Sequence, residues 1–388
     1  MPESKLRGKL KRLLSHSSNS PKTEAPSPKT PTTNGSTNLS STKPEIKTDN
    51  MSLPKTYKQA VFKAQGQPLT IEQTELKLPS KGEILVKVDA CGVCYSDMYA
   101  QYNGMGGGFP LVPGHEIIGK VAAVGEGVTG WKEGDRIGSG WHGGHDGTCR
   151  ACKQGYFQMC DAPIINGENK NGGYAEYCLI RSESAIPIPA NVDAAKTAPL
   201  VCAGVTVFNS IRNMGLKPGA TVAVQGLGGL GHLAIQYARQ MGYHVIAISR
   251  GADKERAARE LGAAEYIDAS KGDPGEALKN LGGASLIVST ARTAEAITPL
   301  LKGAGILGKL LILSVPGEVP VDTFVMLKYG VSVQCWPGGH SGDSAEAIAF
   351  ANSHNIETVV QEFPLDKAQE AYDAMLSGNV RFRAVITI

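Results

Sequence analysis

The chain has 388 residues, of which 41% are hydrophobic, and its 39 Lys and Arg residues stand against 36 Asp and Glu residues. Since domains average roughly 150 residues, this length predicts two or three domains with well-filled cores. The sequence contains no run of roughly 18 uncharged apolar residues, which excludes a membrane-spanning helix. Residues 1–50 carry a net charge of +5 and the remainder −2, so the main body offers no basic surface for nucleic acid.

The N-terminal segment has a composition of its own. Residues 13–50 contain eight Ser, seven Thr and five Pro, too few apolar groups to offset chain entropy. We therefore predict a disordered, basic tail over residues 1–52. Leucines at helical spacing among the basic residues 5–14 resemble a mitochondrial transit peptide, but Pro2 and Glu3 argue against one. We expect a cytoplasmic protein, with a mitochondrial location as the alternative.

A β-rich pattern runs from about residue 57 to residue 188. Side chains in Glu83–Asp89 alternate between apolar and polar, and Ile117–Val124 is largely apolar. Glycine-rich turns at residues 104–108 and 125–127 interrupt the pattern. These features predict a compact, barrel-like sheet domain.

After residue 220 the pattern changes to strands that alternate with helices. Helical segments are predicted at Gly231–Met241 and Asp253–Leu261, and later at Leu365–Leu376, before a last strand at Arg383–Ile388. Short apolar strands with helical crossovers predict an α/β domain with a doubly wound parallel sheet. The six predicted strands are Thr221–Gln225, His244–Ser249, Glu265–Asp268, Leu286–Thr290, Lys309–Ser314 and Val331–Cys335.

Three glycines follow the first of these strands in the pattern Gly-x-Gly-x-x-Gly, at Gly226, Gly228 and Gly231. Between a strand and a helix, this pattern is typical of a dinucleotide-binding loop. The first glycine permits a tight turn, the second lets backbone approach the pyrophosphate, and the third allows close packing of helix and strand. Because helix N-termini attract anions, the phosphates are expected at this point.

The end of the second strand bears on which dinucleotide binds. An acidic residue there would accept hydrogen bonds from the ribose hydroxyls of NAD, but this chain has Ser249, followed by Arg250 and Lys254. Two cations without a carboxylate favour a 2′-phosphate. We predict NADP, with NAD as the alternative.

Five of the eight cysteines fall in two tight clusters, a spacing that favours metal ligation over disulfide bonds. One candidate set combines Cys94, His115 and Cys202, the ligand types of a catalytic zinc with an open fourth position. A second set lies within fifteen residues and suits a closed, structural zinc: Asp146, Cys149, Cys152 and Cys160. The sequence thus predicts two zinc ions per chain.

At these residues the chain resembles the zinc-dependent medium-chain alcohol dehydrogenases, and their shorter, commonly tetrameric microbial branch in particular. The motifs CGVC-x-SD, PGHE-x-x-G, GGYAEY, LxCAGVT and GLGGLG occur in the family's order, and the likeness spans about residues 55–388. The resemblance implies a GroES-like catalytic domain of residues 53–203 and 337–388, and a Rossmann domain of residues 204–336. It also implies a small alcohol or aldehyde as substrate and a homo-oligomer, either tetramer or dimer.

The resemblance assigns roles residue by residue. It implies that Ser96 takes the alcohol proton, Asp97 orients the histidine ligand, and Glu116 approaches the metal during ligand exchange. Further matches concern the cofactor and the substrate: Thr206 near the nicotinamide, Arg383 on the pyrophosphate, and Trp141 in the substrate pocket. The implied activity is reversible hydride transfer between a primary or secondary alcohol and NAD(P).

Two departures from the family pattern stand out beside Ser249. The first structural ligand is usually Cys but is Asp146 here, and the adjacent His145 stays open as an alternative ligand. The histidine that often ends the proton relay is replaced by Tyr99. The cysteines without an implied ligand role are interpreted as core residues: Cys91, Cys178 and Cys335.

Other functions stay open at this point. Aryl or cinnamyl alcohol oxidation, polyol oxidation and carbonyl reduction suit the same fold. An alternative from another class is a non-enzymatic, NADPH-binding zinc scaffold. A zinc-free enone or quinone reductase is disfavoured, because such an enzyme would lack Cys94 and the cysteines of residues 149–160.

Overall fold

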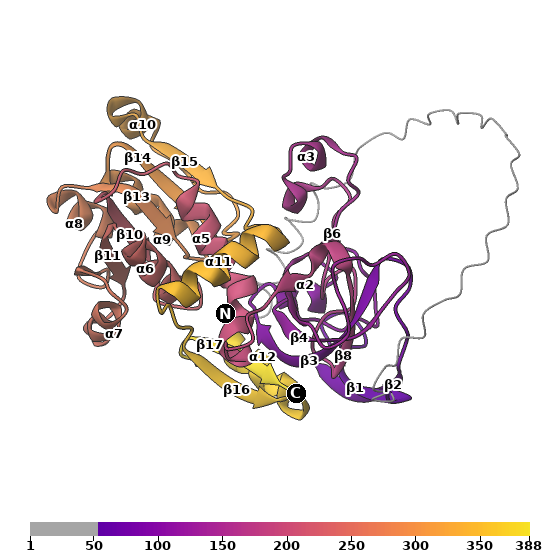
Figure 1. Ribbon diagram of the computed structural model, residues 1–388. Helices are drawn as coiled ribbons and strands as arrows, with labels where there is room; N and C mark the ends of the chain where they lie inside the picture. Colours follow the sequence, from indigo (N-terminus) through magenta and orange to yellow (C-terminus); the bar gives the residue numbers. More distant parts are fainter. Residues whose placement is uncertain (1–52) are drawn as a thin grey trace, which may run out of the picture. The chain divides into compact units, whose positions relative to one another are not determined.

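The structure, a computed structural model, describes residues 53–388 (Figure 1). The tail predicted over residues 1–52 lies outside the described residues. Two large sheets organise the described part, one mostly antiparallel and one parallel. Three clusters of buried apolar side chains lie against these sheets.

The mostly antiparallel sheet has seven strands in the order β16-β17-β3-β4-β5-β9, with β8 paired to β3. Strand β3 pairs with three neighbours, and all of its residues from Ala90 to Val93 are buried. The predicted strand ended at Asp89 because the alternation of polar and apolar residues stops there, where both faces become buried. The strands are β3 (Glu83–Val93), β4 (Ile117–Val124), β5 (Arg136–Ser139), β8 (Tyr177–Arg181), β9 (Ile186–Pro187), β16 (Val360–Pro364) and β17 (Arg383–Thr387).

Shorter elements accompany this sheet. Strands β1 (Thr56–Phe62) and β2 (Leu69–Glu75) form an antiparallel pair, as do β6 (His142–Gly144) and β7 (Ile164–Ile165). The helices of this part are α2 (Asp97–Gln101), α3 (Arg150–Lys153), η1 (Phe157–Met159), η2 (Ser182–Ser184), α4 (Ala194–Thr197), η3 (Ala198–Val201), α11 (Ser341–Ser353), η6 (Leu365–Lys367) and α12 (Ala368–Ser377).

The parallel sheet has six strands in the order β12-β11-β10-β13-β14-β15. The first strand in the chain, β10, therefore lies in the middle, and the order reverses between β10 and β13, the doubly wound arrangement of dinucleotide-binding domains. Ligands of such sheets bind at this reversal, beyond the carboxyl ends of the strands. The strands are β10 (Thr221–Gln225), β11 (His244–Ser249), β12 (Glu265–Asp268), β13 (Ala284–Ser289), β14 (Ala304–Ile312) and β15 (Ser332–Cys335).

Helices connect and cover these strands (Figure 1). Helix α6 follows β10 directly and contacts both β10 and β11, as expected of a right-handed crossover. Its buried side chains include Leu233, Ile235 and Tyr237. The helices are α5 (Ala203–Arg212), α6 (Gly231–Gln240), η4 (Ala252–Lys254), α7 (Glu255–Glu260), α8 (Pro274–Asn280), α9 (Ala294–Ile297), η5 (Thr298–Gly303) and α10 (Thr323–Tyr329).

The sequence-based strand limits are accurate for β4, β10, β11 and β12 but not everywhere. Strand β14 begins at Ala304, five residues before its predicted start, where Gly305 and Gly308 weaken the strand pattern. The interpretation of Cys335 as a core residue is wrong, because it lies exposed on the sheet-edge strand β15. Cys91 and Cys178 are buried, as predicted.

Within residues 53–388, no single helix has the length and apolar composition to cross a membrane. One bent pair, Ala194–Val201 with Ala203–Arg212, passes that test by length and composition alone.

Candidate active site

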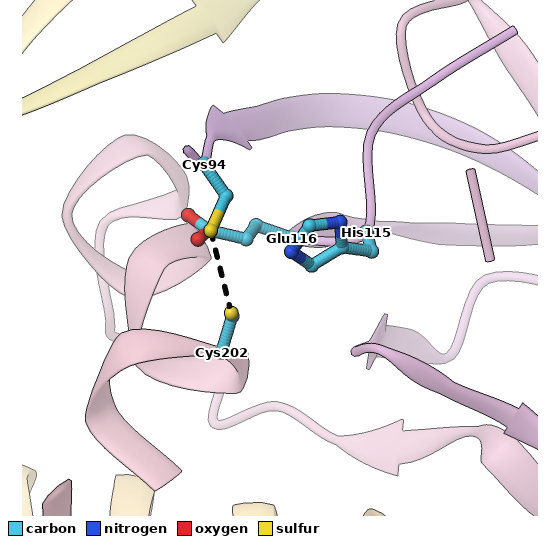
Figure 2. A group of neighbouring side chains, drawn as sticks. All are labelled: Cys94, His115, Glu116 and Cys202. Atoms are coloured by element: carbon cyan, nitrogen blue, oxygen red, sulfur yellow. Dashed lines mark hydrogen bonds between the residues drawn. The ribbon is translucent and has the colours of Figure 1, made fainter. Parts of the chain in front are cut away.

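Three sequence-distant segments bring Cys94, His115 and Cys202 together (Figure 2). Cys94 directly follows β3, His115 precedes β4, and Cys202 directly precedes helix α5. Glu116 joins the group, and one candidate ligand atom from each of the four side chains lies within 4.8 Å of the others. The two sulfur atoms are 3.9 Å apart.

The donor atoms of this group suit a divalent cation. Nε2 of the fully buried His115 and Oε2 of Glu116 have no hydrogen-bond partner among the described residues. A hydrogen bond from Cys202 is the largest of the effects that hold the pKa of the Cys94 thiol well below its usual value. Thiolate and imidazole are the ligands that zinc prefers, and buried polar atoms normally have partners. The residues therefore fit a zinc ion.

Asp97 holds His115 from the other side. Its Oδ1 lies 3.2 Å from Nδ1 of His115, and both side chains are fully buried. Its Oδ2 accepts hydrogen bonds from the backbone N–H of Cys94 at 2.9 Å and from the hydroxyl of Tyr174 at 2.7 Å. This carboxylate thus orients the imidazole and fixes the chain at Cys94, the outer support that metal-binding histidines usually have.

Glu116 links the cation group to the C-terminal strand β17. Its Oε1 pairs with the guanidinium of Arg383, which is itself only 5% exposed. Burial raises the pKa of Glu116 to about 7 although the charge of Arg383 lowers it. The carboxylate fits because position 92 is glycine: a Cβ on Gly92 would lie 1.9 Å from Oε2 of Glu116.

Other residues with an implied role surround this group. Ser96 is half-buried at the start of α2, and Thr206 is half-buried on α5, one turn after Cys202. The Trp141 ring meets the His115 ring edge-on, with centroids 4.9 Å apart. Tyr99 is also half-buried, and its pKa is raised chiefly by burial.

The glycine loop follows β10, at the reversal of strand order. Gly226 has a φ of +96°, and a Cβ on Gly231 would lie 1.7 Å from the carbonyl oxygen of Gly226, so both positions require glycine. A Cβ on Gly228, by contrast, would meet nothing within 4 Å. The side chain of Arg383 lies against Gly229, so this arginine contacts the loop and pairs with Glu116.

Beside the end of β11 lies a carboxylate that was not predicted from the sequence, that of Asp268 at the end of β12. Ser249 is opposite Asp268 in the parallel pairing of β11 and β12. Asp268 Oδ1 accepts hydrogen bonds from the N–H of Gly251 and from Ser270, and these bonds lower its pKa to about 2. Arg250 and Lys254 are exposed on the same turn. The signal in the sequence was an acidic residue at the end of the next strand.

The second predicted cluster forms a separate group, which we call the cysteine lobe (residues 146–160). Ligand atoms of Asp146, Cys149, Cys152 and Cys160 lie within 4.8 Å of one another. The Cys160 sulfur accepts hydrogen bonds from the backbone N–H groups of Asp146 and Ala162. Three sulfur atoms and one carboxylate fit a tetrahedral zinc ion.

Asp146, and not His145, belongs to this group. Backbone N–H groups of Cys149 and Thr148 donate to Asp146 Oδ1 and hold the pKa of its carboxyl well below the usual value. The His145 ring instead stacks on Phe157, and its Nδ1 lies 3.1 Å from Nε2 of His142.

Comparison with known proteins decides the family. Residues 80–190 match the alcohol dehydrogenase GroES-like domain, and residues 229–353 match the zinc-binding dehydrogenase domain. The chain is 68% identical to alcohol dehydrogenase notN of Aspergillus sp. (strain MF297-2), over 87% of this chain and all of that protein. The chain belongs to the zinc-binding alcohol dehydrogenase family. The predicted family and fold class are thereby confirmed.

Further similarities support this assignment. Alcohol dehydrogenase patD of Penicillium expansum is 64% identical, over 86% of this chain and 98% of that protein. Acetophenone reductase from Geotrichum candidum, solved in complex with NAD, superposes with a TM-score of 0.75 at 26% identity, over 87% of this chain and 98% of that one. The protein is therefore an alcohol dehydrogenase that uses zinc and a nicotinamide cofactor, and the non-enzymatic scaffold is ruled out as its description.

Proposed function

We propose that Cys94, His115 and Cys202 hold the catalytic zinc of this alcohol dehydrogenase, and that the cysteine lobe holds a second, structural zinc. The observation that carries the first assignment is the convergence of these three side chains around an imidazole nitrogen that has no hydrogen-bond partner among residues 53–388. Metal analysis of the purified protein tests both assignments. Two zinc ions per chain are expected, one of which is lost in a Cys94→Ser variant.

The chain's own residues then have distinct tasks in the reaction. When bound, zinc supplies a Lewis acid for the alcohol or carbonyl oxygen, and the nicotinamide accepts or returns the hydride. Ser96 takes the proton of the alcohol, and Trp141 forms one wall of the substrate pocket. Glu116 is available for ligand exchange. Position 99, where the relay histidine would stand, is Tyr99, so a bound cofactor would supply a ribose hydroxyl as the group next to Ser96.

The substrate class is a primary or secondary alcohol and the matching aldehyde or ketone. Aryl, cinnamyl and polyol substrates, and carbonyl reduction as the main direction, are the alternatives. An assay of a panel of alcohols and carbonyl compounds in both directions, compared by kcat/KM, separates them. A panel without any zinc-dependent turnover would contradict the proposed site.

NADP is the proposed cofactor, with NAD as the alternative. Exposed Arg250 and Lys254 beside Ser249 support a 2′-phosphate. The carboxylate of Asp268 is the feature that opposes it, but its Oδ1 is engaged by the Gly251 and Ser270 donors. The double substitution Ser249→Asp with Arg250→Gly should move the ratio of kcat/KM values toward NAD by at least tenfold, since one charge-assisted hydrogen bond is worth roughly 1.5–3 kcal/mol. An unchanged ratio would contradict the proposal.

A homo-oligomer, dimer or tetramer, is also proposed. The parallel sheet ends at β15, whose outer edge pairs with no other strand of the described residues, and several exposed apolar side chains lie on β14 and α10, which contact each other. They include Ile306 and Leu307 of β14 and Phe324 and Leu327 of α10, each more than 70% exposed. Such a face favours a second copy, in which two identical edges pair about a two-fold axis. Light scattering of the wild type and of Leu327→Glu with Phe324→Glu tests this, and a monomeric wild type would refute it.

The cytoplasm is the proposed location, with the mitochondrion as the alternative. None of the eight cysteines, all of which lie within the described residues, forms a disulfide bond, which suits a reducing compartment. Imaging of the full chain and of a chain that starts at Met51, each fused to a fluorescent protein, distinguishes the two.

A further inference from the structure

The turn that follows β11 is held by two side chains of the neighbouring strand β12. This turn, residues 249–254, runs from the end of β11 through η4, and we call it the β11 turn. At its middle, the N–H of Gly251 donates a hydrogen bond to Asp268 Oδ1 at 2.9 Å. The carbonyl oxygen of Gly251 accepts a hydrogen bond from the hydroxyl of Tyr266 at 2.7 Å. Side chains of β12 therefore bind both polar backbone groups of one residue in the turn.

Asp268 is firmly placed for this contact. Its Oδ1 also accepts hydrogen bonds from the N–H of Ser270 at 2.9 Å and from the hydroxyl of Ser270 at 2.6 Å. The donors of Ser270, followed by that of Gly251, lower the pKa of Asp268 to about 2, and only 7% of its side chain is exposed. An acidic residue that selects NAD offers its oxygens to the ribose hydroxyls. Asp268 instead directs Oδ1 to the chain itself and acts as an anchor of the turn.

The β11 turn carries the two cations that were predicted to attract a 2′-phosphate. Arg250 directly precedes Gly251, Lys254 follows three residues later, and both are exposed. Asp253 is exposed on the same turn, so the placement of the cations matters as well as their charge. Gly251 has a φ of +91°, and the chain changes direction there between the two cations. A turn that is already ordered loses less conformational freedom when it binds a ligand, which raises the affinity.

We propose that Tyr266 and Asp268 are positioning residues for the cofactor. They hold the polar backbone groups of Gly251 and so fix the turn that presents Arg250 and Lys254 to the 2′-phosphate. This inference rests on the proposed preference for NADP. Because the pyrophosphate is expected at the glycine loop after β10, loss of these contacts should weaken the binding of NADP more than that of NAD.

Two substitutions of Asp268 separate its hydrogen bonds from its charge. Asp268→Asn keeps an oxygen that can accept from Gly251 but removes the charge, and Asp268→Ala removes both. Calorimetry of the full chain measures the affinities for adenosine 2′,5′-bisphosphate and for 5′-AMP, which differ only in the 2′-phosphate. The ratio of these affinities should fall about tenfold in Asp268→Ala, the size of one hydrogen bond to a charged group, and stay within about threefold in Asp268→Asn.

Asp273→Ala is the matched control for a merely structural effect. Asp273 Oδ1 likewise accepts a backbone N–H, that of Gly275 at 2.8 Å, but it does so at the start of α8. This variant should leave the affinity ratio unchanged even where the stability falls. An unchanged ratio in Asp268→Ala, or equal losses in Asp268→Ala and Asp268→Asn, would overturn the proposal. So would a large rise in both variants, which would identify a carboxylate that selects NAD.

Two further measurements keep the test decisive if Asp268→Ala folds poorly. Tyr266→Phe loses only the hydroxyl that donates to Gly251, and the affinity ratio should fall about fivefold, the size of a neutral hydrogen bond. An unchanged ratio would refute the proposal, as would a Gly251 amide that exchanges its hydrogen at an unprotected rate in the wild type. Failure of the proposed NADP preference looks different, because the wild type itself would then bind the bisphosphate no more tightly than 5′-AMP.

Discussion

The two proposed metal sites of this alcohol dehydrogenase are built in opposite ways. Cys94, His115 and Cys202 come from three distant segments, and their surroundings supply Asp97, Glu116 and Arg383 as buried supports. The ligands of the cysteine lobe lie within fifteen residues, on a surface where Asp146 is exposed. Only the first site joins segments that are distant in the sequence. A site assembled by the fold is suited to catalysis, and a site closed by local chain geometry is suited to holding a loop in place.

The sharpest test of this contrast is loss of a ligand in the fold-assembled site. Cys94→Ser should lower kcat by about 10³-fold or more. A Lewis acid lowers the activation free energy by several kcal/mol, and each 1.36 kcal/mol changes the rate about tenfold. Cys91→Ala is the matched control, since Cys91 lies three residues earlier, fully buried but outside the ligand group. Steady-state assays and zinc analysis of both variants provide the measurement. Near-native turnover of Cys94→Ser would mean that the site is not the catalytic one.

A smaller loss of activity or zinc affinity is expected when Asp97, which contacts the ligand His115, is replaced. Asp97→Asn removes the charge opposite His115 and should lower zinc affinity or kcat/KM by about 10–100-fold. Asp89→Asn, at a half-buried position in β3, serves as the control and should leave both quantities unchanged. Chelator competition and kinetics follow the effect. If the two variants behaved alike, support of the histidine by Asp97 would be unnecessary.

Loss of a ligand in the cysteine lobe should lower the stability of the protein and leave the rate of the reaction unchanged. Cys149→Ser should lower the free energy of unfolding by roughly 3 kcal/mol, the contribution of a metal present at about 100 times its Kd. The kcat of the remaining folded enzyme should stay within about twofold of the wild type. Denaturant unfolding and active-site-normalised kinetics distinguish the two effects, with Asp161→Ala as a neighbouring control. A large fall in kcat at unchanged stability would reverse the assignment of the two sites.

The smallest of the expected effects is a loss of stability in acid. It arises from a buried histidine, His232, near the glycine loop. Burial lowers the pKa of His232 to about 4, so in the unfolded chain, with the ordinary value of 6.5, this residue binds a proton that the folded protein excludes. The contribution of His232 to the free energy of unfolding is therefore fully present above pH 6.5 and is lost as the pH falls toward 4. The loss is about 2 kcal/mol at pH 5. His232→Phe should flatten this part of the profile in denaturant unfolding. An identical pH profile in the variant would contradict this cause.

Local patterns in the sequence were sufficient to predict much of the fold. The glycine motif after an apolar strand, and the cysteine spacing of the lobe, are properties of short segments. Strand β3 beyond Asp89 and the early start of β14 were missed, because burial on both faces and glycine within a strand remove the alternating pattern. Cys335 was misplaced for a related reason: nothing in an apolar segment tells an edge strand from a central one.

Residues 94, 115 and 202 have no common spacing, so the sequence offered them as a candidate ligand set only by their residue types, and the family resemblance supplied their assignment to one zinc ion. Asp268 was not predicted at all. It gains its significance from a neighbour on another segment, the end of β11. Such pairings depend on loop conformation and strand register, which single-sequence patterns do not specify.

Gly92 shows how an empty volume can be as indispensable as a reactive group. It carries no side chain of its own, and the carboxylate of Glu116 occupies the space that any side chain at this position would fill. A library of all single substitutions would accordingly show that position 92 tolerates no other residue, as is expected of the metal-binding residues. Such intolerance would not mean that position 92 takes part in the reaction. It would mean that the position must leave space for the side chain of Glu116.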